Sequence, residues 1–202
     1  MKTIGLILGC VFLNAAAWAE TQTFDFKDPK TVNNVVFKTD APLESINGTA
    51  TGISGKVTFD PADPASVKGK IVVEANSLHV PNSMMQQHLH SDMWLDVAKF
   101  PQITFDVVSV ANAKTKDNVT TADVTGNITI KGVTKKMSAP VKMTYLKDKL
   151  KDRFPALKGD LLVLRSTFTV KRSDFGINKG NFEDKVSDEI ELTLSLAGQS
   201  PK

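Results

Sequence analysis

Apolar and polar residues alternate along most of the chain after about Asn34, and this pattern restricts the fold more than any other feature of the sequence. A period of two places successive side chains on opposite faces of a β-strand, so each alternating segment predicts a strand with one buried face. The clearest segment closes the chain, where apolar residues occupy every second position from Ile190 to Leu196. The other apolar series are Val35 and Phe37; Ile53, Gly55, Val57 and Phe59; Val67, Gly69, Ile71, Val73 and Ala75; Ile103, Phe105 and Val107; Ala122, Val124, Gly126, Ile128 and Ile130; Met137, Ala139, Val141, Met143 and Tyr145; and Leu162, Leu164, Ser166, Phe168 and Val170.

Short segments of turn residues separate these strands, at 60–64, 113–118, 131–132 and 147–155. Strands joined this tightly are antiparallel, because a parallel crossover takes about a dozen or more residues. No internal repeat or interdomain linker is visible in the sequence. We therefore predict one all-β domain, a lipocalin-like antiparallel barrel of about eight strands, because the long strands favour a barrel over a sandwich. A barrel of this size either fills with its own side chains or holds one small ligand.

One segment, between Val80 and Pro101, interrupts the alternation. Asn82 or Ser83 can cap a short helix there. Residues at helical spacing follow, and 96–99 can form a further turn. The sequence thus predicts a helical insertion near residues 82–99. The residues at helical spacing are Met84, Met85, His88 and Leu89.

The first residues have the features of a cleavable signal peptide. Lys2 supplies a positive charge, residues 4–17 carry none, and Ala17-Trp18-Ala19 has the small residues that a signal peptidase cuts after. We predict a signal peptide over residues 1–19, a barrel domain over residues 20–202, and a periplasmic location. The apolar run is shorter than the roughly 20 residues that cross a bilayer, so we expect no membrane span.

Cys10 offers an alternative, because residues 7–10 loosely resemble a lipoprotein cleavage box. Cleavage there would leave an apolar core of residues 4–9 only, below the roughly 7–15 residues of an ordinary signal, so the soluble form is favoured. Cys10 is the one cysteine, so the mature chain would form no disulfide. The net charge is only +3, and Lys and Asp or Glu residues are interspersed. We expect neither nucleic-acid binding nor electrostatic membrane binding.

Three segments resemble the motifs of the YceI-like family, in the family's order. Residues 88–105, HLHSDMWLDVAKFPQITF, resemble its signature, and 126–135 and 171–177 resemble its glycine-to-threonine hairpin and its R-x-D-F-G-I segment. The resemblance covers essentially the whole mature chain. It implies a lipocalin-like barrel with a helix near one end and an apolar tunnel that holds a polyisoprenoid or a similar amphiphile, often quinone-like or a prenyl diphosphate. The family is not known for catalysis.

This sequence departs from the family pattern at His90, where arginine is usual, and at Trp94-Leu95, where two phenylalanines are usual. If the arginine of relatives meets an anionic head group, His90 would be a weaker and pH-dependent substitute, because imidazole loses its charge near neutrality. The head group that this protein prefers can therefore differ from that of its relatives.

The apolar faces carry no charge, so we expect the barrel interior to hold either side chains or a lipid. The prediction for ligand contact combines the helical insertion with the inward faces of the strands. Ligand contact is favoured over core filling for Met84, Met85 and Trp94, because methionine adapts to a flexible tail; for Met137 and Met143 the two are equally weighted. The predicted ligand-binding residues are Met84, Met85, Leu89, Trp94, Phe100, Ile103, Phe105, Val107, Met137, Val141, Met143, Leu162, Leu164 and Phe168.

A metal site is disfavoured, although His79, His88 and His90 lie close in sequence, with Asp92 as a further ligand. Residues two apart on a helix point in different directions, so His88 and His90 would not converge. We expect a hydrogen-bonded His88 near the barrel wall and a solvated His90. Arg172 and Asp174 are better interpreted as a structural clasp that fixes the turn after a strand than as catalytic groups. We therefore expect no catalytic residue, no metal, and no cofactor beyond a bound isoprenoid lipid.

The leading hypothesis is a periplasmic carrier or store for a long isoprenoid, with the tail along the barrel axis and the head near residues 84–100. A second hypothesis is an interaction protein whose barrel is filled and whose surface docks a partner or a second copy in a homodimer. A metal-assisted enzyme would require the three histidines to converge. The sequence alone does not identify the ligand.

Overall fold

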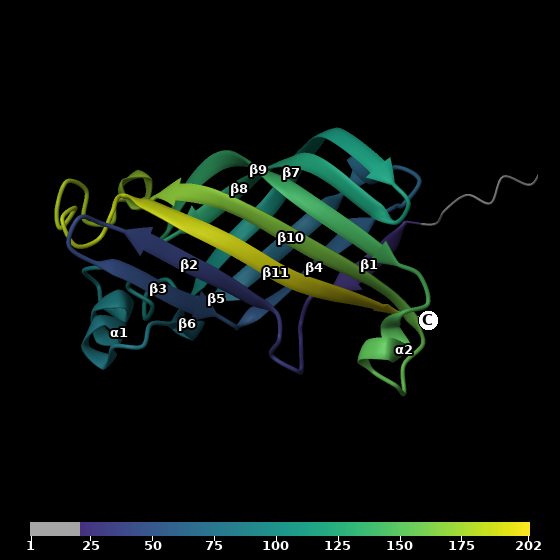
Figure 1. Cartoon of the computed structure of the whole chain (residues 1–202), viewed down its shortest axis with the longest axis horizontal. Coiled ribbons are helices and arrows are strands. Elements are labelled where there is room, and N and C mark those ends of the chain that lie inside the picture. Colours follow the sequence, from purple (N-terminus) through teal and green to yellow (C-terminus); the bar gives the residue numbers. More distant parts are fainter. Residues whose placement is uncertain (1–20) are drawn as a thin grey trace, which may run out of the picture.

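The computed structural model describes residues 21–202, which form one closed antiparallel barrel (Figure 1). The predicted signal peptide, residues 1–19, and Glu20 lie outside the described residues. The strands are β1 (Gln22–Asp25), β2 (Asn34–Asp40), β3 (Ser45–Ala50), β4 (Ile53–Phe59), β5 (Lys68–Glu74), β6 (Leu78–His79), β7 (Gln102–Lys116), β8 (Val119–Ile130), β9 (Val133–Leu146), β10 (Gly159–Lys171) and β11 (Glu189–Pro201).

The barrel has eight strand positions, because three pairs of consecutive short strands each form one interrupted strand. These pairs are β1 with β2, β3 with β4, and β5 with β6. β1 and β2 both pair with β11, β3 pairs with β2 and β6, and β4 pairs with β1 and β5. From β5 onward each strand pairs with the next long strand, and β11 returns to β1 and β2 to close the ring. Strands that follow one another in the sequence are thus neighbours in the barrel. The predicted all-β antiparallel barrel of about eight strands is confirmed.

The helical insertion is also found where the alternation stops. Helix α1 (Ser83–His90) begins after Asn82, whose side chain accepts a hydrogen bond of 3.0 Å from the Met85 backbone N–H. Residues 91–100 form turns, including hydrogen bonds from the Lys99 and Phe100 N–H groups to Asp96 O. The remaining helical elements are η1 (Pro64–Ser66), η2 (Ala75–Ser77), α2 (Leu150–Arg153) and η3 (Arg172–Phe175).

The two ends of the barrel differ. In Figure 1, α1 and the loop before β11 lie at one end, on the left, and α2 and the C-terminus lie at the other. That second end is filled with large apolar side chains that have almost no exposed surface. They are Phe24, Phe26, Phe59, Met143, Leu162 and Leu196. We call it the closed end.

A buried polar network completes the closed end. Asp160 is fully buried and accepts hydrogen bonds from Tyr145 Oη at 2.8 Å, the Asp148 N–H at 2.7 Å and Lys202 Nζ at 3.0 Å. Burial by itself would raise the pKa of Asp160, but the hydrogen bonds from Asp148, Tyr145 and Lys202 outweigh it and hold the pKa below the ordinary 3.8. Asp160 therefore stabilises the fold in its ionised form.

Acid should weaken the closed end through Asp160. Because the folded-state pKa lies below 3.8, the stabilisation is complete above that pH and is lost as the pH falls through the folded-state value. We expect Asp160→Asn to lower the free energy of unfolding by about 1–3 kcal/mol at neutral pH. The difference between the variant and the unaltered protein should narrow below pH 3.8, which urea unfolding at a series of pH values would measure. A difference that stays constant down to acid pH would contradict this assignment.

β9 separates from β10 partway along its length. The two strands pair only between Val141 and Leu146 on β9, and Pro140, which has no N–H to donate, comes directly before. Beyond that point η3 lies beside β9, and Phe175 and Ile177 pack with residues of β8 and β10 in a second apolar cluster. The other buried members of this cluster are Leu95, Ile128, Ile130 and Val170.

Candidate functional site: an apolar cavity inside the barrel

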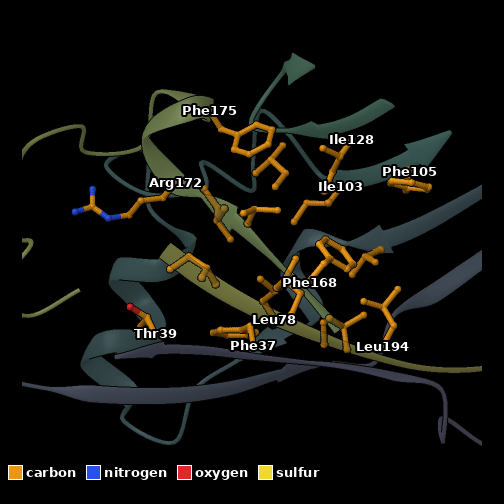
Figure 2. A pocket seen from close by; sticks show the side chains of 18 of the residues that line it. Phe37, Thr39, Leu78, Ile103, Phe105, Ile128, Phe168, Arg172, Phe175 and Leu194 are labelled. Carbon is orange, nitrogen blue, oxygen red and sulfur yellow. The ribbon is translucent and has the colours of Figure 1, made fainter. Parts of the chain in front are cut away.

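The barrel encloses a cavity of about 810 Å³ that reaches the surface at the end carrying α1. Its wall consists of alternating inward residues from most of the strands, as Figure 2 shows for Phe37 and Thr39 on β2 and for Ile103 and Phe105 on β7. Several wall residues, such as Leu194, are only half-buried although they face inward. Their side chains therefore leave the interior open, and the barrel is not filled by its own residues.

Most of the predicted ligand-binding residues line this cavity. α1 and the turns after it contribute residues at the mouth, and β7, β9 and β10 contribute residues deeper in the barrel. The predicted residues that the structure brings together in the wall are Met84, Met85, Leu89, Trp94, Ile103, Phe105, Val107, Val141, Met143, Leu164 and Phe168.

Phe100, Met137 and Leu162 do not line the cavity, so the structure corrects their predicted place in the wall. Leu162 has no exposed surface and is part of the closed end. The ring of Phe100 lies against Gly132 in the β8–β9 turn. Met137 lies on the part of β9 that has separated from β10, and it packs against the cluster around Phe175.

Part of the cavity wall consists of residues that were not among the predicted ligand-binding residues. Phe37, Leu192 and Leu194 line the cavity from β2 and β11, and the alternation already placed them on inward faces. Phe182 and Val186 line its mouth from the loop before β11, where no periodic pattern exists to signal them.

Two glycines allow large aromatic side chains to lie flat on the wall. A Cβ atom at Gly126 would lie 2.4 Å from the Phe105 ring, and one at Gly48 would lie 2.1 Å from the Phe37 ring. Both rings are therefore packed directly over backbone on the neighbouring strand. This arrangement keeps them out of the centre of the barrel, so the lumen stays open although its wall contains phenylalanine.

No aromatic side chain lines the lumen at mid-depth on the strands from β9 to β3. The pairing register aligns Val141 with Ser166 and Ser166 with Leu194, and it continues through Val35 to Ala50 on β3. All of these residues line the cavity. The next line of register toward the mouth instead carries Phe168 and Leu192. On β9, β10, β11, β2 and β3 the level of Ser166 therefore carries no aromatic side chain, whereas the next level does.

The mouth lies between α1 with its following turns and the loop 176–188. The rings of Trp94 and Phe182 stand 6.3 Å apart, and the Asn178 side-chain amide donates a hydrogen bond of 3.1 Å to Met93 O. Met84, Met93 and Phe182 are all exposed apolar side chains that also line the cavity. The rim is therefore apolar and continuous with the interior.

Arg172 holds the loop 176–188 in place. Its side chain is buried, and its N–H groups donate to the backbone carbonyls of Ile177, Asn178, Asn181, Val186 and Ser187. A guanidinium has five N–H donors, so these carbonyls occupy its full donor capacity. The predicted clasp is present, but its acceptors are carbonyls of the loop.

Asp174, the carboxylate assigned to the clasp from sequence, is exposed, and Asp188 is the acid beside Arg172. Burial would raise the pKa of Asp188, but hydrogen bonds from the Ser173 hydroxyl and N–H outweigh it. The charge of Arg172 acts in the same direction, so the pKa is lowered. Asp188 thus stays ionised and anchors η3 to the end of the loop.

The histidines do not meet at one point. His90 Nε2 lies 2.9 Å from Leu78 O and 2.7 Å from the Gln86 amide, while His88 and His79 are exposed. The sequence had suggested the reverse, a bonded His88 and a solvated His90. Within residues 21–202 no group of three or more His, Cys, Asp or Glu is placed to hold a metal ion. In the same residues no helix is long and apolar enough to cross a membrane.

The closed barrel, its apolar cavity with one open end and its helix-bordered mouth define a lipocalin-like barrel protein. The model of the YceI-like domain matches residues 26–197, so the chain belongs to the YceI-like family. Protein YceI of Salmonella arizonae is 32% identical over 155 residues, which cover 77% of this chain and 74% of that protein.

Solved structures share the fold at low sequence identity. BcnA of Burkholderia cenocepacia superposes with a TM-score of 0.66 at 23% identity, covering 82% of this chain and 95% of that chain. A polyisoprenoid binding domain from Saccharophagus degradans, implicated in plant cell wall breakdown, gives a TM-score of 0.65 at 13% identity, covering 90% of this chain and all of that domain. The likeness extends over the whole barrel.

Proposed function

We propose that this protein is a periplasmic carrier or store for a long-chain isoprenoid lipid, held with its tail inside the barrel. The observation that carries the proposal is the cavity of about 810 Å³, which has an almost wholly apolar wall and opens at one end. Each methylene group moved from water into such a wall gains about 0.8 kcal/mol, so a prenyl tail is retained without a charged anchor. The polyisoprenoid binding domain of Saccharophagus degradans, which has the same fold, gives independent support.

The proposal assigns the protein to binding, not to catalysis. The cavity wall consists mainly of aliphatic and aromatic side chains, and its charged members, Glu44, Arg172 and Lys185, lie toward the mouth. Arg172 is saturated by backbone carbonyls. The alternative of a docking module with a filled barrel has less support, because an open lumen has no role in it.

The sequence of the first residues supports the location. We propose that residues 1–19 direct export and are removed, which leaves Glu20 as the first residue of the mature protein. The mature protein would then lie in the periplasm, between the two membranes from which an isoprenoid could be drawn.

Native mass spectrometry of protein purified without detergent from the host's periplasmic fraction tests both proposals in one experiment. We expect the chain mass to correspond to a start at Glu20 and a second mass of one lipid per chain, which solvent extraction then identifies. A chain of the right mass without lipid would shift the assignment to a docking protein. A full-length or acylated chain would overturn the proposed export and cleavage.

A further inference from the structure

The outer wall of the barrel has an open depression that the proposed lipid binding does not use. It spans the four adjacent strands β7 to β10 (Figure 1). Two irregularities of the sheet meet here. β7 bulges between Ala111 and Lys114, and the pairing of β9 with β10 ends at Val141 and Ser166. A bulge bends its strand and turns a side chain in a new direction, so the depression is formed by the course of the backbone.

Three exposed cations lie on one line across this depression. The pairing register places Arg165 of β10 opposite Lys142 of β9. Lys142 in turn lies opposite Thr121 of β8, which lies opposite Lys114 of β7. On the other side of Arg165 the line continues to Ser195, so it carries no acid over five strands. None of the three cations forms an ion pair within residues 21–202. Like charges directly opposite each other on neighbouring strands are destabilising, so this arrangement has an uncompensated cost.

A second pair of like charges on the outer wall is compensated. Lys56 of β4 lies opposite Lys70 of β5. Each of these lysines has an acid on its other side, because Asp25 lies opposite Lys56 and Asp106 lies opposite Lys70. Lys70 Nζ and the Asp106 carboxylate are 3.2 Å apart. The pair in the depression has uncharged residues in both corresponding places. An anion from solution could supply the negative charge that is missing there.

The Arg165 guanidinium is partly held in place. Its Nη1 donates to Leu164 O at 3.0 Å and to Leu196 O at 3.3 Å, while Nε and Nη2 have no partner within residues 21–202. A guanidinium donates two parallel hydrogen bonds to a phosphate or carboxylate, and it does so best when its position is fixed. Among the described residues, Asp123 is the one acid that lines the depression, and its carboxylate accepts a hydrogen bond of 2.7 Å from the Asn112 amide. The lining thus has three cations and one acid.

We propose that this outer depression binds a phosphate group, to which Arg165 donates two hydrogen bonds while Lys142 and Lys114 supply further positive charge. A phosphate monoester carries about 1.5–2 negative charges near pH 7, so it would neutralise the lining. A soluble phosphate compound and an anionic lipid head group offer the same oxygen atoms. The low net charge of the chain does not reveal this site, because its cations come from three separate strands. The site lies on the outer face of the wall, so the proposal does not depend on lipid binding in the lumen.

Titration with inorganic phosphate at constant ionic strength tests the proposal, with NMR of the backbone amides of Thr121, Lys142 and Arg165 as the measurement. We expect saturable shifts of these amides with phosphate and none with chloride. Lys142→Gln combined with Arg165→Gln should weaken phosphate binding at least about tenfold, because charge-assisted hydrogen bonds are lost. This double variant should remain folded, since it removes a repulsive pair.

Matched variants separate this site from a general effect of charge. Lys56→Gln combined with Lys70→Gln removes the same charge at the compensated pair and should leave phosphate binding unchanged. Arg165→Lys keeps the charge but loses the two parallel donors, and it should weaken binding about three- to tenfold. Shifts that do not saturate, or equal weakening by both glutamine double variants, would overturn the proposal. Lipid binding in the lumen should be the same in all of these variants, so the two proposals fail independently.

Sedimentation with vesicles identifies the source of the phosphate group. Binding to phosphatidylglycerol vesicles, but not to phosphatidylcholine vesicles, that is lost in the Lys142→Gln and Arg165→Gln double variant would identify an anionic lipid head group. No sedimentation, or sedimentation that the double variant retains, would assign the phosphate bound in the titration to a soluble compound.

Discussion

Replacing Val141 and Leu194 together by tryptophan is expected to lower the affinity for a prenyl lipid more than about a hundredfold. Both side chains flank Ser166 at mid-depth, and both are half-buried because they face open space. Two indoles there would displace about four methylene groups of a tail, at about 0.8 kcal/mol each. The lost burial of about 3 kcal/mol corresponds to about two powers of ten in affinity, which calorimetric titration with geranylgeraniol would measure.

The same strands supply a control. Lys142 and Ser195 are the next residues along β9 and β11, and their side chains point to the outer face. Lys142→Trp with Ser195→Trp adds the same bulk outside the barrel and should leave binding unchanged. Thermal unfolding of the inward pair should show no loss of stability, because the indoles enter empty volume. Unchanged binding by a well-folded inward variant would show that the ligand does not occupy the lumen.

Replacing Arg172 by methionine is expected to lower the free energy of unfolding by about 3 kcal/mol. Methionine fills a similar volume but offers no donor, so the loop carbonyls that Arg172 engages lose their partners while still largely shielded from water. Hydrogen bonds to a charged donor contribute about 1.5–3 kcal/mol each, but they are not additive within one loop, and some carbonyls regain water. Chemical denaturation would give the difference in stability.

Local proteolysis adds a second measurement for Arg172→Met, because the loop 176–188 should become the first site of cleavage. Arg172→Lys should not restore stability, since an ammonium group cannot reach carbonyls spread from Ile177 to Ser187. Asp174→Asn, in the same motif but exposed, should change the free energy of unfolding by less than about 0.5 kcal/mol. A large effect of Asp174→Asn would contradict the assignment of the clasp to the loop carbonyls.

The barrel could be predicted from sequence because the alternation of apolar and polar residues that determines it is visible within each segment of the chain. The alternation on β11 from Ile190 to Leu196 is a property of the chain that needs no partner to be recognised, and the same holds for Asn82 as the cap of α1. For the same reason most inward residues of β7, β9 and β10 were placed correctly in the cavity wall.

The parts that could not be predicted depend on contacts between distant segments. Alternation shows which face of β10 is inward, but not that Leu162 lies beyond the bottom of the cavity among Phe24 and Phe26. The loop 176–188 has no periodic pattern, so the residues that Arg172 binds could not be read from its motif. The pairing of His90 with Leu78 O likewise joins α1 to β6 across a turn.

Because one end of the barrel is closed, a ligand can enter and leave the lumen only through the mouth. This affects the rate of ligand exchange as well as the affinity. A lipid held as proposed would enter tail first and leave by withdrawing along the same path, because Phe24, Phe26 and Leu162 occupy the far end. Nearly all of the tail's contacts must be broken before a receiving membrane or protein can stabilise it. The residence time should therefore lengthen steeply with each added isoprene unit, while the rate of capture changes little. The dissociation rate would therefore depend on tail length, so that short chains are released quickly and long chains are retained.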